Sequence, residues 1–197
     1  MIQTSSATRK NRYPQLFQIV AKELGGNSNP KILSFGCSSG EEVFSIKEYI
    51  PDAELTGVDI NHRAIRIAKK RAPKGSFRFF HYLEDNWTKA DHYDCIFAMA
   101  VFQKSEHQDH KRKTALESFT FNKFKERLEH LNSLLKPGGL LVIEHSDFSF
   151  LDLPLSKSYS ICENDILIRR KRPVLSDQNV KISHSHIYPR IFIKRSN

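Results

Sequence analysis

Residues 32–42 read ILSFGCSSGEE, and this stretch decides the fold. An apolar run of strand length ends in a loop of Gly, Cys and Ser, and two glutamates then open a stretch with helical spacing. Gly36 and Gly40 allow the backbone to turn sharply, and the small side chains between them let a ligand approach main-chain N–H groups. The start of the following helix favours an anionic ligand group. The stretch predicts a strand, a candidate ligand-binding turn and a helix, although such a turn can also simply join the two elements.

The alternation of strand and helix continues on both sides of this turn. Helical spacing predicts helices over 13–24, 41–50, 62–72 and 122–135. Short apolar runs predict strands over 31–35, 54–60, 77–83, 93–102 and 140–145, and 188–195 alternates like an edge strand. This order is typical of an α/β fold, a parallel sheet with helices on both faces. Because no repeat or linker divides the chain, we expect one domain over 1–197, with 1–30 as an N-terminal helical extension.

The composition indicates a globular, cytoplasmic protein. Hydrophobic residues make up 39% of the chain, and no apolar stretch approaches the roughly 18 residues needed to cross a bilayer. The N-terminal sequence MIQTSSATRKNRYPQ lacks the apolar core and cleavage site of a signal peptide. Cys37, Cys95 and Cys162 are scattered without metal-ligand spacing, which favours a reducing compartment, most simply the cytoplasm.

The net charge of +9 is concentrated near the C-terminus. Residues 166–197 contain eight basic residues and one acid, so they alone supply +7. Such a segment could meet RNA, an anionic membrane surface or an acidic protein. It could equally be a solvated surface, because no aromatic residues are arranged among the basic ones as a base-stacking platform.

A carboxylate stands at the end of the second predicted strand. Asp59 lies in the sequence GVDI (57–60), at the spacing from Gly40 that a ribose-binding acid keeps from its glycine loop. In parallel sheets, ligands bind at the carboxyl ends of the strands, and a carboxylate there can accept hydrogen bonds from both ribose hydroxyls of a nucleoside. Asp59 could instead cap the helix that starts near Asn61. The loop and the acid together favour a nucleoside site.

The loop pattern narrows the choice of nucleoside. It reads GxxxG, which is neither the dinucleotide fingerprint GxGxxG nor a GxxxxGK[ST] phosphate loop, and it disfavours an NAD-dependent oxidoreductase. Glu41 and Glu42 would repel a pyrophosphate but suit a ligand with an ammonium group. S-adenosylmethionine (SAM) carries an ammonium, a carboxylate, a ribose and an adenine.

The motifs FGCSSGEEVFSI, TGVDIN, YDCIFAMAVF and LLKPGGLLVI resemble, in order and spacing, those of class I SAM-dependent methyltransferases. The first is most similar to the chemotaxis receptor (CheR-like) glutamate methyltransferases, and the resemblance covers about residues 30 to 146. It implies a Rossmann-like, doubly wound, seven-stranded sheet that is mostly parallel, with an antiparallel last strand in RIFIKR. It does not extend to the receptor substrate, because this chain has no room for the docking subdomain. Ser34 also stands where the family usually has an acid.

The resemblance implies a set of cofactor-binding residues. The loop Gly36, Cys37, Ser38, Ser39 and Gly40 would pass under the methionyl part, with Glu41 near its ammonium group. Asp59 would hold the ribose, with Ile60 against the adenine, and Asn61 would also belong to the cofactor-binding set. Glu84 or Asp85 would reach the adenine amino group, and Ala98, Met99 and Ala100 would line the floor.

Residues after the fifth strand are the candidates for catalysis. Methyl transfer needs the acceptor and the methyl group in line, and a base helps only when the acceptor carries a proton to remove. His145, Glu144 and Asp147 could supply that base, or could cap a turn and pack on a helix. We expect the acceptor pocket within 146–188. Its candidate walls, which could equally be core residues, are Phe148, Phe150 and Tyr159.

No metal site is predicted. The sequences HQDH (107–110) and HSH (184–186) contain histidines, but tetrahedral zinc needs at least three protein ligands and no clear third ligand accompanies them. The sequence therefore predicts a cytoplasmic methyltransferase that uses SAM, yields S-adenosylhomocysteine (SAH) and acts on a small molecule. The alternatives are an RNA or protein carboxylate methyltransferase, and a module that binds SAM without turnover.

Overall fold

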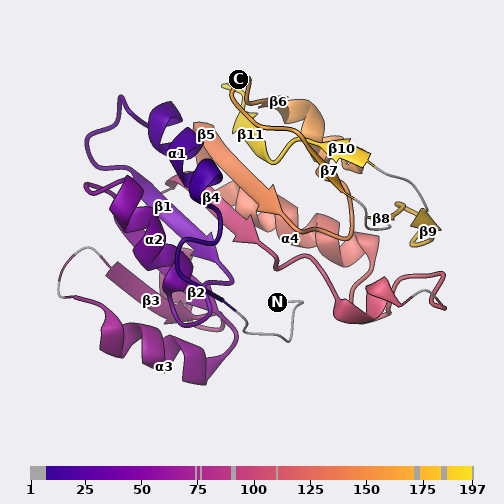
Figure 1. Cartoon of the computed structure of the whole chain (residues 1–197), viewed down its shortest axis with the longest axis horizontal. Helices are drawn as coiled ribbons and strands as arrows, with labels where there is room; N and C mark the ends of the chain where they lie inside the picture. The colour runs from indigo at the N-terminus through magenta and orange to yellow at the C-terminus, as the bar shows by residue number, and fades with distance from the viewer. Residues whose placement is uncertain are drawn as a thin grey trace.

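A seven-stranded sheet with helices on both faces forms the frame of the protein (Figure 1). The structure, a computed structural model, describes residues 8–73, 75, 77–89, 92–109, 111–170, 174–182 and 186–196, without the side chains of 108, 168–170 and 186–187. The strand order is β3-β2-β1-β4-β5-β11-β6. The first five strands are mutually parallel, and β11 is antiparallel to both of its neighbours. The predicted α/β, Rossmann-like sheet with one antiparallel strand is confirmed.

The bounds of the elements follow the sequence patterns closely. The sheet strands are β1 (Lys31–Phe35), β2 (Glu54–Asp59), β3 (Phe77–His81), β4 (Tyr93–Met99), β5 (Leu135–Glu144), β6 (Tyr159–Ile161) and β11 (Ile191–Lys194). The helices are α1 (Pro14–Glu23), α2 (Glu41–Tyr49), α3 (His62–Arg71) and α4 (Phe121–Leu134). Asn61 caps α3 and Thr120 caps α4 through side-chain oxygens that accept backbone N–H groups.

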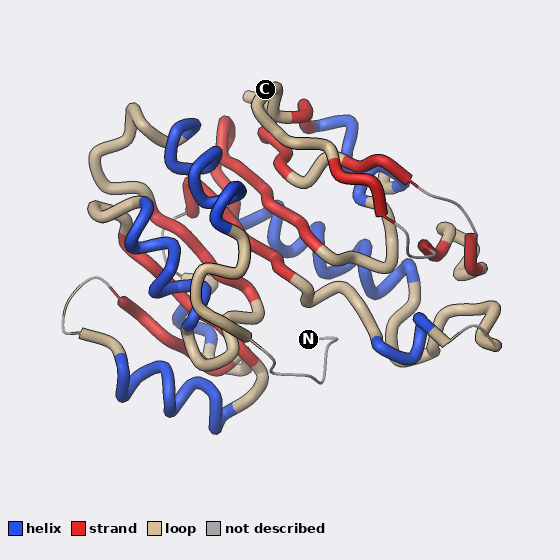
Figure 2. The backbone as a smooth tube through the Cα atoms, in the orientation of Figure 1, coloured by secondary structure: helices blue, strands red, loops and turns tan. Residues whose placement is uncertain are grey.

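Smaller elements fill the connections after β3, β4 and β5. The 3₁₀ segments are η1 (Asp85–Trp87), η2 (Ser105–Gln108), η3 (Phe150–Asp152) and η4 (Pro154–Ser158). Two short antiparallel pairs join β7 (Ile168–Arg170) to β10 (His186–Tyr188) and β8 (Val174–Leu175) to β9 (Lys181–Ile182). Figure 2 shows the long loop between β4 and α4 lying beyond the end of the sheet.

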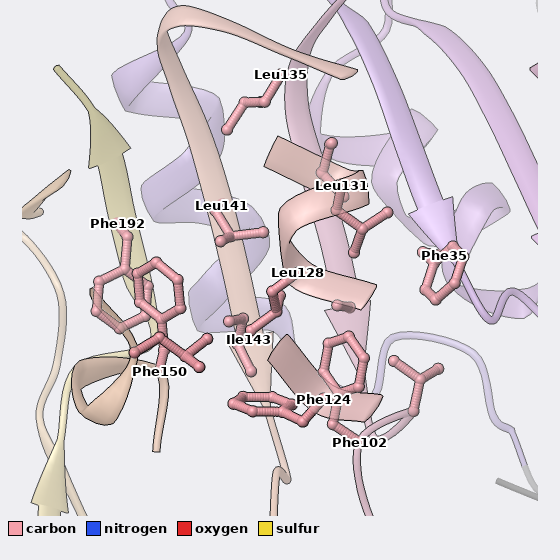
Figure 3. Packing of buried hydrophobic residues seen from close by; sticks show 14 of the residues in the cluster. Phe35, Phe102, Phe124, Leu128, Leu131, Leu135, Leu141, Ile143, Phe150 and Phe192 are labelled. Carbon is pink, nitrogen blue, oxygen red and sulfur yellow. The ribbon is translucent and has the colours of Figure 1, made fainter. Parts of the chain in front are cut away.

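Two apolar layers fix the helices on the sheet. On one face, Phe124, Leu128 and Leu131 of α4 pack against Leu141 and Ile143 of β5 (Figure 3). The opposite face is covered by apolar residues of the other three helices, Leu16, Phe17, Val20, Val43, Ile46, Ile65 and Ala68. Each of these side chains except Ala68 contributes about 1.5–3 kcal/mol when it is fully buried. Packing on both faces leaves the strand ends and their loops available for a ligand.

Two predictions about the C-terminal half were wrong in detail. The stretch 188–195 was expected to be an edge strand, but β11 begins only at Ile191 and lies between β5 and β6. The edge is β6, which is too short to show an alternating pattern. The sequence KPGG (136–139) was expected to precede the strand, but it lies inside β5. There the pairing shifts from Tyr93↔Leu135 to Cys95↔Leu140, and left-handed Gly138 accommodates the bulge.

Candidate cofactor site and neighbouring cavity

The glycine loop after β1 is held in a left-handed conformation at three alternate positions. The φ angles are 90° at Gly36, 50° at Ser38 and 89° at Gly40. The N–H of Gly36 donates to the carbonyl of Val58, 2.7 Å away, which fixes the turn against β2. A Cβ on Gly40 would lie 2.9 Å from the ring of Phe44. The loop therefore requires glycine at its end for both backbone conformation and packing.

Asp59 joins this loop to the start of α3. One carboxylate oxygen accepts from the N–H of Ser38 and the other from the N–H of Asn61, each at 2.8 Å. The helix cap is Asn61, whose side chain accepts from the N–H groups of Arg63 and Ala64. Asp59 is therefore not the cap. Each of its oxygens retains a second lone pair that a ribose hydroxyl can use.

Cys37 faces the core and contributes only its backbone to the loop surface. Its side chain is buried, and a Cβ on Gly57 would lie 2.9 Å from its sulfur. Burial, with smaller contributions from Asp59 and Glu42, raises the pKa of the Cys37 thiol well above its usual value. The thiol is therefore kept neutral.

The two glutamates at the start of α2 have different partners. Glu41 forms a two-pronged ion pair with Arg71 at the end of α3, and one of its contacts is 3.2 Å long. The carboxylate that was expected near the cofactor's ammonium group is thus already neutralised. Glu42 accepts a hydrogen bond from the hydroxyl of Ser34, 2.8 Å away on β1. Ser34 stands where an acid was expected, so α2 supplies that acid to the end of β1.

Glu42 is held in a poorly solvated position. Burial raises its pKa to about 7, against the smaller lowering effects of the Ser34 hydrogen bond and of the positive charge on Arg12. An ammonium group beside this carboxylate would remove much of the cost of ionising it. Sequence reasoning placed Glu41 here, and the polar Ser34 within a buried strand was the signal that could have pointed to Glu42.

Of the two candidate acids after β3, one is folded back on the chain. The carboxylate of Glu84 accepts from the N–H of His81 at 2.8 Å, whereas Asp85 is exposed at the start of η1. His81, which sequence reasoning missed, is buried; it donates through Nε2 to the carbonyl of Ile60 and accepts through Nδ1 from Leu83. Of the two acids, Asp85 is the one left exposed to a ligand.

An exposed imidazole stacks on this buried one. The rings of His62 and His81 lie 3.4 Å apart and 9° from parallel, which fixes the start of α3 against the end of β3.

The end of β4 gives the site a small, apolar floor. Ala98, Met99 and Ala100 are all buried. The strand ends because Ala100 adopts a left-handed φ of 60°, and its N–H donates to the carbonyl of Glu144 at 2.7 Å. The predicted floor residues thus lie beside the predicted catalytic ones.

Glu144 and His145 meet at the end of β5. In an extended strand they would point to opposite faces, but a left-handed φ of 56° at His145 turns its imidazole back, and Nδ1 lies 3.6 Å from the Glu144 carboxylate. The other carboxylate oxygen is 3.3 Å from the guanidinium of Arg190. Arg190 also pairs with the buried Asp165, at 3.5 Å. The ring of Tyr13, which precedes α1, lies 5.9 Å from that of His145.

The carboxylate of Asp147 is hydrogen-bonded to the loop after β4. Its carboxylate accepts from the N–H of Lys104 and from Nδ1 of His107, at 2.6 and 2.8 Å. Nε2 of His107 in turn accepts from the N–H of Leu116. Both side chains are buried, so the pair ties the loop after β4 to the loop after β5. This geometry favours a positioning role for Asp147.

A cavity of about 30 Å³ lies beside Glu144 and His145. It is lined by Ile143, Glu144, His145, Ser146, Phe148, Ser149, Phe150, Leu151, Tyr188, Pro189, Arg190 and Phe192. Phe148 and Phe150 therefore line the cavity and also belong to the hydrophobic core. Tyr159 packs on Phe150 and donates to the side chain of Asn132, away from the lining, and burial raises its pKa.

Several predictions fall partly or wholly outside the described residues. Within the described part, no three His, Cys, Asp or Glu side chains are grouped as a metal site requires. His110, His184 and Ser185 lie outside it, as do residues 171–173 and the side chains of 169 and 170 in the basic segment. No helix among the described residues has both the length and the apolar character needed to cross a membrane.

Comparisons with known proteins agree with this architecture. Residues 8–194 match the family model described as methyltransferase domain. Malonyl-[acyl-carrier protein] O-methyltransferase 2 of Ilyobacter polytropus is 29% identical over 112 residues, which are 56% of this chain and 37% of that enzyme. The chain thus spans well under half the length of that curated relative.

One solved structure of the same fold, and a second one with a weaker match, are similar to this chain. TehB from Haemophilus influenzae superimposes with a TM-score of 0.55 at 15% identity, covering 90% of this chain and 61% of that one. The plantazolicin methyltransferase BpumL, solved with a monoazolic desmethylPZN analogue and SAH, gives a TM-score of 0.45 at 21% identity, covering 66% of this chain and 46% of that one.

Proposed function

Because the chain belongs to the methyltransferase-domain family, we propose that it transfers a methyl group from SAM to a small-molecule acceptor and releases SAH. The observation that carries this proposal is the position of Asp59, which fastens the glycine loop while keeping lone pairs for two ribose hydroxyls. The resemblance of the first motif to CheR-like enzymes supports an ammonium site at the Gly-Glu-Glu sequence but not their protein substrate.

The residues at the strand ends fit the parts of the cofactor. Glu42, beside Ser34, supplies a carboxylate for the ammonium group, in place of Glu41. Asp59 takes the ribose, and Asp85 is the free acid for the adenine amino group. No side chain in the described part of the chain caps the start of α2, so its first N–H groups can meet an anionic ligand group.

The chemistry required of the protein is mainly positioning. The lone pair of the acceptor forms a bond to the methyl carbon as the carbon–sulfur bond breaks, and the electrons of that bond stay on sulfur. His145 is the group best placed to take a proton from the acceptor, because its ring borders the cavity and Glu144 stabilises the positive charge that results. Asp147 acts through the loops that it joins.

The charges around the cavity favour a hydroxyl or amine acceptor over a carboxylate. Arg190 is a buried cation on the wall, but among the described side chains it is already shared by the carboxylates of Glu144 and Asp165. A further carboxylate would meet an excess of negative charge. The name of the Ilyobacter relative describes a malonyl carboxylate attached to a carrier protein, which makes that acceptor class the main alternative.

Calorimetric titration with SAM, SAH and NAD in parallel tests the cofactor assignment. We expect SAM and SAH to bind, NAD not to bind, and Asp59→Ala to weaken SAH binding by about tenfold or more, a loss of about 1.4 kcal/mol. Asp52→Ala is the matched control, because Asp52 is an exposed acid away from the loop. Binding that Asp59→Ala leaves unchanged would overturn the ribose assignment.

Turnover is tested separately by SAH release against panels of amines, hydroxyl compounds and carboxylates of similar size. Methylation of amines or hydroxyls with His145 required supports the proposal. Methylation of carboxylates alone would contradict the acceptor class. SAM binding without transfer to any of the panels would favour a SAM-binding module. RNA binding that weakens when residues 169–172 are neutralised would instead support an RNA methyltransferase.

A further inference from the structure

The segment that precedes α1 is fastened along one side of α2. We call residues 8–13 the N-terminal strap (Figure 1, indigo). The N–H of Asn11 donates to the hydroxyl of Ser45 at 2.8 Å, and Tyr49 donates to the Asn11 side chain at 3.0 Å. Because Ser45 and Tyr49 are four residues apart, they share one face of the helix. The strap is therefore docked on the helix that begins at the glycine loop.

The other end of the strap reaches a different strand. Tyr13 packs its ring 5.9 Å from that of His145, which follows β5. The sheet order places β4 between β1, which leads into α2, and β5. In going from Ser45 to His145, the strap thus passes the carboxyl ends of the strands that carry the glycine loop and the apolar floor. Ser45, the strap's anchor on α2, is three residues after Glu42, about one helical turn.

Arg12 lies between these two anchors. Its guanidinium is 5.1 Å from the centre of the Tyr13 ring and is half-buried. Among the described residues, it has no ion-pair partner. Its charge is nevertheless close enough to Glu42 to lower the pKa of that carboxyl, against the larger effect of burial. Among the described residues, no hydrogen bond or ion pair joins the Arg12 guanidinium to the Glu42 carboxylate.

We propose that Arg12 binds the carboxylate of the cofactor's amino-acid end while Glu42 binds its ammonium group, so that the strap closes this end of the site. The inference rests on the proposed function. A zwitterion has one charge of each sign on adjacent groups, and Arg12 and Glu42 present the complementary pair. A guanidinium offers paired donors that match the two oxygens of a carboxylate. The uncapped N–H groups of α2 add to the same interaction.

Lys10 supplies the matched control on the same strap. Its ammonium pairs with Glu48 on α2 at 2.6 Å, and both side chains are largely exposed. Lys10→Gln therefore removes a positive charge and a strap contact without touching the proposed clamp. Arg12→Gln removes the guanidinium while keeping a polar side chain of similar reach, and Arg12→Lys keeps the charge but loses the paired donors.

Three ligands separate the parts of the cofactor in a calorimetric titration. SAH carries both charged groups, 5′-deoxy-5′-(3-aminopropylthio)adenosine keeps the ammonium but lacks the carboxylate, and methylthioadenosine lacks both. We expect Arg12→Gln to weaken the binding of SAH by about tenfold or more and to leave the affinities of the other two ligands unchanged. Arg12→Lys should lose less SAH affinity than Arg12→Gln, and Lys10→Gln should leave the affinities of all three ligands unchanged. Glu42→Gln should weaken the binding of both ligands that carry the ammonium group.

Each other outcome has a definite meaning. Equal weakening of SAH and methylthioadenosine by Arg12→Gln would overturn the proposal, because the strap would then only support the fold. Unchanged SAH binding would overturn it as well, while methylthioadenosine binding by the same protein would leave the cofactor assignment in place. Failure of the unmodified protein to bind any of the three ligands would overturn the proposed function itself. Melting temperatures of the variants check that each is folded.

Discussion

Binding of the cofactor should cause the Glu42 carboxyl to release a proton. With a pKa of about 7, its carboxyl is about half protonated at pH 7 in the free protein. An adjacent ammonium favours the ionised form, so SAH binding at pH 7 should release up to about half a proton. Titrations in two buffers of different ionisation enthalpy measure this release. Glu42→Gln is the control and should abolish it; release that persists in that variant would assign the proton to another group.

The same carboxyl should make the free protein less stable as pH rises. The folded pKa of Glu42 lies above the ordinary glutamate value of 4.5, so between pH 4.5 and 7 the folded state binds more protons than the unfolded state. The contribution of this group to stability therefore falls as pH rises through that window. Melting temperatures of the protein and of Glu42→Gln, measured from pH 5 to 8, should diverge toward pH 8. Parallel curves would contradict this.

At the residue scale, the sequence indicated which types of side chain lie at the candidate site but not which partners hold them. Glu41 and Glu42 are adjacent in the sequence but point about 100° apart on a helix, so only one of them can face Ser34. Arg71, which forms the ion pair with Glu41, lies at the far end of a different helix, α3. Glu84 and Asp85 also differ, because only the carboxylate of Glu84 accepts a hydrogen bond from the backbone N–H of His81. The ribose role of Asp59 stays a prediction.

At the element scale, the His107–Asp147 pair should hold two loops together. His107→Ala removes a buried side-chain partner of the Asp147 carboxylate, and breaking a buried pair in this way typically costs about 3–5 kcal/mol. Urea unfolding should show a loss on that order, and acceptor turnover should fall more than SAH affinity. His92→Ala, at an exposed position, should have little effect. A stable Asp147→Asn variant without turnover would instead favour a catalytic role for Asp147.

Local patterns predicted the helices and the first four strands to within a few residues. Their apolar spacing and caps are local features, so neighbouring residues are enough to reveal them. The start of β5 could not be found in this way. Lys-Pro-Gly-Gly is a helix-stop sequence, and whether it then lies in a loop or in a bulge depends on pairing with β4, which lies on the other side of α4 in the sequence.

At the scale of the whole molecule, Arg190 connects β5, the start of β11 and the turn that holds Asp165. Its side chain is 3.3 Å from Glu144 and 3.5 Å from Asp165, and all three are almost fully buried. Arg190→Met should remove the guanidinium that two buried carboxylates share and lower the free energy of unfolding by about 3–5 kcal/mol. Chemical denaturation measures this loss. Arg66→Met, on the exposed side of α3, is the control; similar losses in both variants would contradict the argument.

The overall topology came from the resemblance as well as from the pattern. Alternation of strands and helices predicted a parallel sheet, but periodicity gives no strand order. The antiparallel strand was implied by the family motifs, whereas its place between β5 and β6 depends on pairings with segments that lie well before it in the chain. A three-residue strand such as β6 has too little pattern to be recognised alone.

The place of β11 has a consequence during protein synthesis. Every other strand of the sheet leaves the ribosome before Ile191–Lys194, yet this strand lies between two of them. Until it emerges, β5 has one unpaired edge and β6 has no partner in the sheet. A nascent chain with an open apolar edge is a target for chaperones and for aggregation with neighbouring chains. We therefore expect slow translation of the final segment to lower the yield of folded protein, although the first four strands are already complete.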